Sequence, residues 1–163
     1  MNGIAITLRA LHDGERHLEK DLLAAARRHR ADHEVHHVAT DVARWSHEHA
    51  ERIARTAQHY GLDLSGPAGD AGPGLVAAVR EKTAEALGRR PETGLLLLHD
   101  LRALHLAAAE NSLHWEMLAQ VAQATGEGRL LDLATACHPQ TLRQMRWTNT
   151  TIKVLSPQLL SSV

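Results

Sequence analysis

Residues 8–25 read LRALHDGERHLEKDLLAA, and their apolar side chains recur at the three- and four-residue steps of one helix face. Glu15 stands in that face at a position where the pattern would place a leucine. A carboxylate inside a helical core loses its hydration unless a cation or hydrogen-bond donors pair with it. The stretch therefore predicts a long amphipathic helix with one buried carboxylate. In a bundle its candidate partners are a metal ion, an arginine or one of the 13 histidines.

The whole chain predicts an all-α fold. Ala, Leu, Arg and Glu dominate, Gly and Pro cluster in a few places, and the two-residue alternation of strands is absent. We expect one domain over residues 1–163. Its predicted segments are helices over about residues 4–30, 34–60, 75–87, 91–124 and 129–155, and a tail over residues 156–163.

The connection between the second and third long helices is much longer than a turn requires. A crossover of this length, here containing the short helix 75–87, lets those two helices run parallel. That connectivity is the one found in the ferritin-like four-helix bundle.

Composition narrows the location and the partners. A net charge of −1 gives no long-range attraction to nucleic acid or to a membrane surface. The lone Cys137 excludes an internal disulfide, the amino terminus lacks the layout of a secretion signal, and no apolar run approaches the ~20 residues that span a bilayer. We therefore expect a cytoplasmic protein that binds neither nucleic acid nor membrane. Long helix faces favour a homodimer, and a protein partner is also compatible with them.

Each long helix places one ionisable side chain in a predicted apolar stripe: Glu15, His49, Glu110 and His138. At about 1.5 Å per residue, Glu15 and His49 lie equally far from the turn that joins their helices, so they should face each other. His138 and His114 lie one turn away from Glu110, and these three are expected to form a second group. The third stripe comprises Leu106, Glu110, Leu113, Met117 and Val121.

A di-metal carboxylate centre needs this kind of pattern, with a Glu from each of two helices and a Glu-x-x-His motif from each of the other two. Several carboxylates are required because they offset the repulsion between two cations. Here the residue three before His49 is Ser46, and the fourth helix has no acidic residue after Asp132. Glu48 is a possible additional ligand, so the expected site is incomplete.

Three segments resemble the YciF-like branch of the ferritin-like superfamily. Residues 11–18 (LHDGERHL) resemble its opening segment, residues 47–53 (HEHAERI) its second-helix segment and residues 109–117 its third-helix segment. The resemblance implies that Glu15, His49 and Glu110 correspond to metal ligands. It also implies a role in metal or oxidative-stress handling, with oxygen or peroxide as the reactant.

The fourth helix departs from the family pattern. Where the family has an acidic ligand cluster, this chain has residues 141–145 (TLRQM), and Ser46 replaces the acidic partner of the second helix. The guanidinium of Arg143, or that of Arg146, would pair with Glu110 and replace the charge of a lost metal. His138 precedes Pro139, so it marks a kink as readily as a ligand.

Two functions follow, from different classes. In the first, a partly degraded di-metal site built from Glu15, His49 and Glu110, with His114 or His138, binds iron or zinc; an enzyme here would carry iron-dependent oxidase-type chemistry. In the second, the chain binds no metal. We expect this second function as readily as the first, because the site lacks carboxylates that a di-metal centre needs. Glu15 and His49 then form a buried ion pair, and the bundle is a catalytically silent dimer or partner scaffold. The remaining histidines, such as His29, His33, His36 and His37, are expected at the surface, and Trp45, Trp115 and Trp147 in the core or at an interface.

Overall fold

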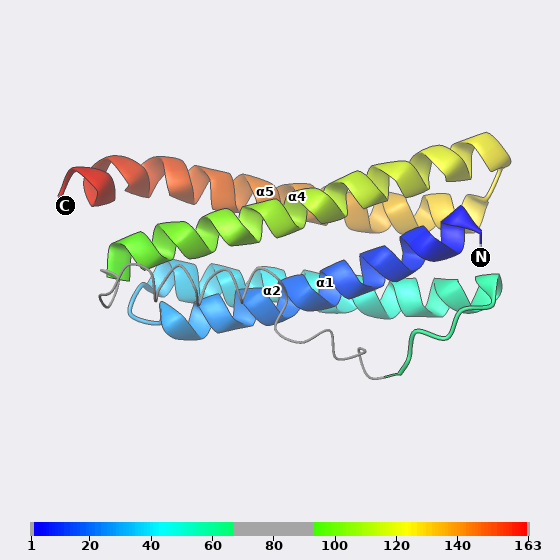
Figure 1. Cartoon of the computed structure of the whole chain (residues 1–163), viewed down its shortest axis with the longest axis horizontal. Helices are drawn as coiled ribbons and strands as arrows, with labels where there is room; N and C mark the ends of the chain where they lie inside the picture. Colours follow the sequence, from blue (N-terminus) through cyan, green and yellow to red (C-terminus); the bar gives the residue numbers. More distant parts are fainter. Residues whose placement is uncertain (1, 67–92, 163) are drawn as a thin grey trace.

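The structure, a computed structural model, describes residues 2–66 and 93–162 and consists there of four long helices with no strand (Figure 1). The all-α prediction is confirmed. The elements are α1 (Gly3–Arg28), α2 (His33–Ala57), the short 3-10 helix η1 (Gln58–Tyr60), α4 (Thr93–Thr125) and α5 (Gly128–Ser161). The predicted short helix over residues 75–87 and most of the predicted crossover lie outside the described residues.

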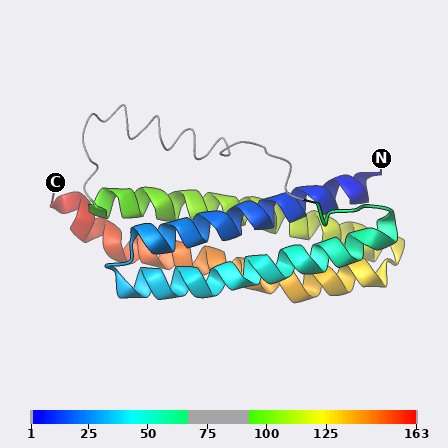
Figure 2. The ribbon, with the colours of Figure 1, turned by 90° about the horizontal axis from the view of Figure 1, so that it is seen from below.

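The four helices pack side by side as two hairpins. α1 contacts α2 and α4, and α5 contacts α4 and α2, so α1 lies diagonally across from α5. Figures 1 and 2 show that α2 and α4 both run toward the end of the bundle where the chain begins, whereas α1 and α5 run away from it. The parallel course predicted for the second and third long helices is therefore observed.

Polar caps and glycines set the helix ends. The side chains of Asn2 and Asp32 accept hydrogen bonds from the backbone N–H of Ala5 (2.9 Å) and Val35 (3.1 Å), which would otherwise lack helical partners. Gly61, with a φ of 73°, ends η1 in the left-handed conformation that glycine tolerates best.

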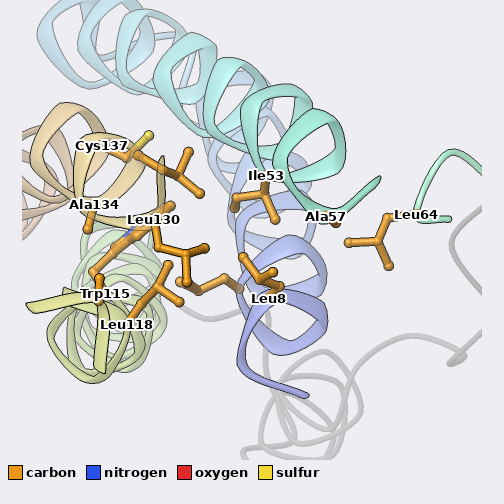
Figure 3. Close-up of a cluster of buried hydrophobic side chains, with 12 residues drawn as sticks. Leu8, Ile53, Ala57, Leu64, Trp115, Leu118, Leu130, Ala134 and Cys137 are labelled. Atoms are coloured by element: carbon orange, nitrogen blue, oxygen red, sulfur yellow. The ribbon is translucent and has the colours of Figure 1, made fainter. Parts of the chain in front are cut away.

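The apolar core is divided along the bundle axis. One cluster fills the end near the amino terminus and contains residues of all four long helices, including Leu8, Ile53, Trp115 and Leu130 (Figure 3). A second cluster, around Leu18 and Leu22 of α1, fills the middle of the bundle. Between these clusters in α1 lies Glu15, so a polar layer separates two dry regions.

The predicted end of the fourth long helix is wrong. α5 continues through Pro157 to Ser161 instead of stopping at about residue 155. Leu159 of this last segment packs against α4 at Gly94, where an added Cβ would lie only 2.5 Å from a Leu159 methyl carbon. The packing of Leu159 against α4 compensates for the backbone hydrogen bond that Pro157 cannot donate within α5.

The predicted stripe of α4 is also wrong, because it lies on the outer face. Leu106, Leu113 and Met117 are more than half exposed, and Glu110 is exposed with them. The buried face of α4 is the opposite one. It contains Leu97, Asp100, Leu101, Leu104, Ala108, Asn111, Ser112, Trp115, Leu118 and Ala122. This inner face carries several polar and small residues. Judged from the sequence alone, the outer stripe is therefore as apolar as the inner face.

Candidate functional site

A buried polar layer crosses the bundle at Glu15. The side chains of Glu15 and His49 are fully buried, and Glu15 Oε1 lies 3.1 Å from His49 Nδ1. The indole Nε1–H of Trp115 donates to the same carboxylate oxygen at 3.1 Å. Antiparallel packing of α1 on α2 brings Glu15 and His49 to one height, as their equal distance from the turn predicts. The expectation that they face each other is confirmed.

The imidazole of His49 is bonded on both sides. Its Nε2 lies 2.7 Å from the side-chain oxygen Oε1 of Gln140 on α5, while Nδ1 faces Glu15. Both ring nitrogens therefore lie within hydrogen-bond distance of a side chain, a carboxylate on α1 and an amide on α5. The ring also stands edge-on to Trp115, with centroids 5.9 Å apart. A metal ion bound by either ring nitrogen would have to replace one of these two contacts.

The adjoining interior positions are filled by neutral polar groups. Gln144 on α5 donates through Nε2 to the backbone oxygen of Val42 and to Ser46 Oγ, both at 2.9 Å. One turn further along α5, the hydroxyl of Thr148 lies 2.9 Å from Nδ1 of His105 on α4. These side chains therefore form further buried hydrogen bonds beside the contacts that join Glu15, His49 and Gln140.

Asn111 on α4 also belongs to the interior, and Gly14 makes room for it. A Cβ at position 14 would lie 2.1 Å from Asn111 Oδ1, closer than any contact allows. The glycine inside α1 is thus explained by the close approach of α4 to the residue next to Glu15. A glycine in the middle of a strong helix pattern was the signal for this contact in the sequence.

The other predicted ligands do not join Glu15 and His49. Glu110 and Glu48 are exposed, which corrects the prediction of a core position for Glu110. His138 is half-buried and bonds through Nε2 to Ser112 Oγ at 2.8 Å, and half-buried His114 is not among the partners of Glu15 or His49. Within the described residues, no ion pair joins Glu110 to Arg143 or Arg146, both of which are exposed.

The chemistry of the donor set does not fit a di-metal centre. Across residues 2–66 and 93–162, no three His, Cys, Asp or Glu side chains are grouped so that they could hold a metal ion. Cys137 lies in the apolar cluster beside this layer (Figure 3), and burial raises the pKa of its thiol to about 11, although the Arg52 guanidinium acts in the opposite direction. A thiol with that pKa stays protonated at neutral pH and is a poor ligand and nucleophile.

A second buried charge cluster lies toward the other end of the bundle. Asp100 on α4 is fully buried, and its Oδ2 lies 2.7 Å from His29 Nε2 and also accepts from Arg28 at the end of α1. His29 was expected at the surface and is instead buried. Sequence spacing missed it because His29 follows the last helical turn of α1, where the apolar stripe no longer applies.

A solvent-open pocket of about 390 Å³ lies beside α1 and α2, between the polar layer and Leu64. Its polar rim includes His12, Arg16 and His47. His47 is already held by carboxylates, with Glu19 at 3.0 Å and Glu51 at 3.4 Å. Burial, and then the nearby Arg16, lower the pKa of His12. The pocket is open to solvent, and Ala50, Ala54 and Leu64 give it an apolar part beside the charged groups.

The three tryptophans differ in burial. Trp115 is fully buried, whereas Trp45 and Trp147 are half-buried at the edge of the middle cluster. Sequence reasoning missed mainly the neutral residues of the site, Asn111, Gln140 and Gln144. It considered ionisable side chains as candidates, and amides are not ionisable.

Comparison of the chain with protein-family models, with curated proteins and with solved structures finds no match. None of the described helices is both long enough and apolar enough to cross a membrane.

Proposed function

We propose that this chain is a ferritin-like bundle without enzymatic activity, in which a hydrogen-bonded polar layer takes the place of a di-metal centre. The observation that carries the proposal is the bonding of His49, whose two ring nitrogens are taken by Glu15 and Gln140. The parallel course of α2 and α4 supports the ferritin-like part. The function of such a bundle lies on its surface, in binding a protein partner or another copy of itself.

The buried layer has a physical purpose even without metal. A desolvated ion pair contributes little net stability compared with apolar packing, but it penalises every helix register that separates its members. Gln144 adds to this, because its bonds to Val42 and Ser46 fix the height of α5 against α2. The network therefore specifies one arrangement of the four helices, which a surface-binding scaffold requires.

One observation favours a second function, metal handling at a mononuclear site. Glu15 Oε2 is buried and has no hydrogen-bond partner, so one carboxylate oxygen remains open to a cation. A single iron or zinc ion there would take His49 Nδ1 as its second ligand, so this nitrogen would give up its contact with Glu15 Oε1, while Nε2 could keep its contact with Gln140. The chain then supplies two ligands, which is fewer than structural or catalytic sites of these metals use.

Metal content separates the two functions. Protein purified without a tag and without chelator is analysed for iron and zinc, and its thermal midpoint is measured before and after chelation. We expect less than a tenth of an equivalent of either metal, as an order of magnitude, and an unchanged midpoint. Near-stoichiometric metal together with a midpoint that falls on chelation would overturn the proposal and establish the mononuclear site.

A gain-of-ligand variant sharpens this test. Ser46→Glu places a carboxylate three residues before His49, in the Glu-x-x-His spacing of a di-metal centre. If only the incomplete donor set prevents binding, the variant should be stabilised by added zinc more than the wild type is. A wild type that zinc stabilises to the same degree would contradict the metal-free proposal.

A further inference from the structure

The outer face of α4 is an apolar surface with no partner in the described chain. Leu106, Leu113 and Met117 are 56%, 63% and 52% exposed and succeed one another along one helix face. Leu142 of α5, 43% exposed, adjoins this face because it lies one turn from His138, which bonds to Ser112 of α4. Scattered exposed leucines are ordinary, but several large apolar side chains on one exposed helix face, here interrupted by Glu110, are typical of an interaction site.

Charge flanks this stripe in a pattern that complements itself. Arg102 and Glu116 are both exposed on the side of α4 that faces α5, near opposite ends of the stripe. If two α4 helices pair antiparallel and cross between Ala109 and Glu110, Leu106 lies opposite Leu113 of the second copy. The same register sets Arg102 at nearly the height of Glu116 of the second copy, because the two lie about equally far from the crossing point.

Because this pairing is two-fold symmetric, the leucine contact and the opposite-charge pair each occur twice at the interface. Leucine meets leucine on either side of the axis, and each end carries an opposite-charge pair at the solvent-exposed rim. Leu142 of each copy lies on the same flank as these charges. One feature opposes the pairing, since the Glu110 carboxylates of both copies lie close to the axis and repel each other.

We propose that the chain forms a homodimer through antiparallel packing of the outer faces of α4, with Leu106 and Leu113 at its centre and Arg102 paired with Glu116 of the second copy. This inference names the partner that the proposed function leaves open. It does not depend on the metal content of the interior, so either conclusion can fail while the other stands.

Sedimentation equilibrium on the full chain tests the proposal. Wild-type protein should sediment as a dimer at micromolar concentration, and Leu113→Lys should raise the dissociation constant by about a hundredfold or more, since each dimer buries this leucine twice. Val154→Lys is the matched control, because Val154 is also highly exposed but lies on α5 away from the stripe. Circular dichroism establishes that each variant keeps its helices. A wild-type monomer, or a dimer that survives Leu113→Lys, would overturn the proposal.

Charge exchange tests the register. Arg102→Glu should weaken the dimer by about tenfold, and adding Glu116→Arg should restore it, because the opposite-charge pairs are rebuilt with their signs exchanged. Glu110→Gln should tighten the dimer by removing repulsion near the axis. Failure of the double exchange to rescue Arg102→Glu would contradict this register.

A cysteine cross-link locates the axis. Glu110→Cys should form an intermolecular disulfide under mild oxidation, whereas Gln120→Cys on the same helix should not, because it lies far from the crossing point. The native Cys137 is buried and does not compete. Cross-linking of Gln120→Cys but not of Glu110→Cys would overturn the antiparallel arrangement.

Discussion

Glu15 on α1 is fully buried between a histidine and a tryptophan, whereas Glu110 on α4 lies in solvent among exposed leucines. Both carboxylates interrupt an apolar stripe of a long helix, and the resemblance of the sequence led us to expect both as metal ligands. The difference lies in the helices that carry them. α1 has one apolar face, and burying it fixes the orientation of Glu15.

α4 has two apolar faces, and only one can be buried in a single chain. Packing selects the face in which Ala108 and Asn111 allow α1 to approach closely, as the contact of Gly14 with Asn111 shows. The larger side chains Leu106, Leu113 and Met117 then remain outside. A second stripe on one helix therefore indicates a second interface, which is where the proposed homodimer places it.

The largest expected effect is on the free energy of unfolding, and it should distinguish Glu15 from Glu110 directly. Glu15→Leu leaves His49 Nδ1 and the Trp115 indole N–H buried without their carboxylate partner, so we expect the free energy of unfolding to fall by about 3–5 kcal/mol. Glu110→Gln, at an exposed position, should change it by less than about 0.5 kcal/mol. Urea denaturation at one protein concentration measures both. Equal costs for the two variants would mean that Glu110 is not on the outer face.

Gly14→Ala should have the next largest effect, because it disrupts the close contact between Gly14 of α1 and Asn111 on the inner face of α4. The new Cβ would overlap Asn111 Oδ1, and we expect a loss of about 1–3 kcal/mol. Gly3→Ala is the control, since nothing lies within 4 Å of a Cβ there and alanine favours helix. Adding Asn111→Ala should recover part of the loss. A Gly14→Ala protein as stable as wild type would show that α4 does not approach α1 this closely.

The smallest effect concerns pH and the pocket one turn before Glu15. Burial lowers the pKa of His12 below its ordinary value of 6.5, so the unfolded chain binds a proton at a higher pH than the folded chain does. Stability from this group is complete above pH 6.5 and falls as the pH drops below it. The thermal midpoint should therefore fall less for His12→Gln than for wild type between about pH 7.5 and about pH 5.5. An equal fall in both proteins would count against a buried, neutral His12.

Sequence reasoning reached the all-α class, the helix boundaries of α1 and α2 and the pairing of Glu15 with His49. It did so because one clear period of apolar residues runs through each of these helices and the turn between them is short. It missed the buried face of α4 because hydrophobicity alone ranks Leu106 and Leu113 above Ala108 and Asn111. It missed Gln140 and Gln144 because their roles depend on contacts between helices distant in the chain.

The second buried charge cluster, around Asp100, could not be predicted from the apolar pattern for a related reason. His29 becomes buried only because Asp100, on a helix more than 70 residues later, reaches the end of α1. Tertiary contact decided its environment, and local spacing carried no signal of it.

The most direct test of the account is a double-mutant cycle on Glu15 and His49 in chelator-treated protein, with the free energy of unfolding measured for wild type, Glu15→Leu, His49→Leu and the double variant. If the two side chains are each other's partners in a metal-free core, each single variant should lose several kcal/mol, as an order of magnitude, and the double variant should be more stable than either. Additive losses would contradict the account, as would a Glu15→Leu penalty that appears only when metal is restored.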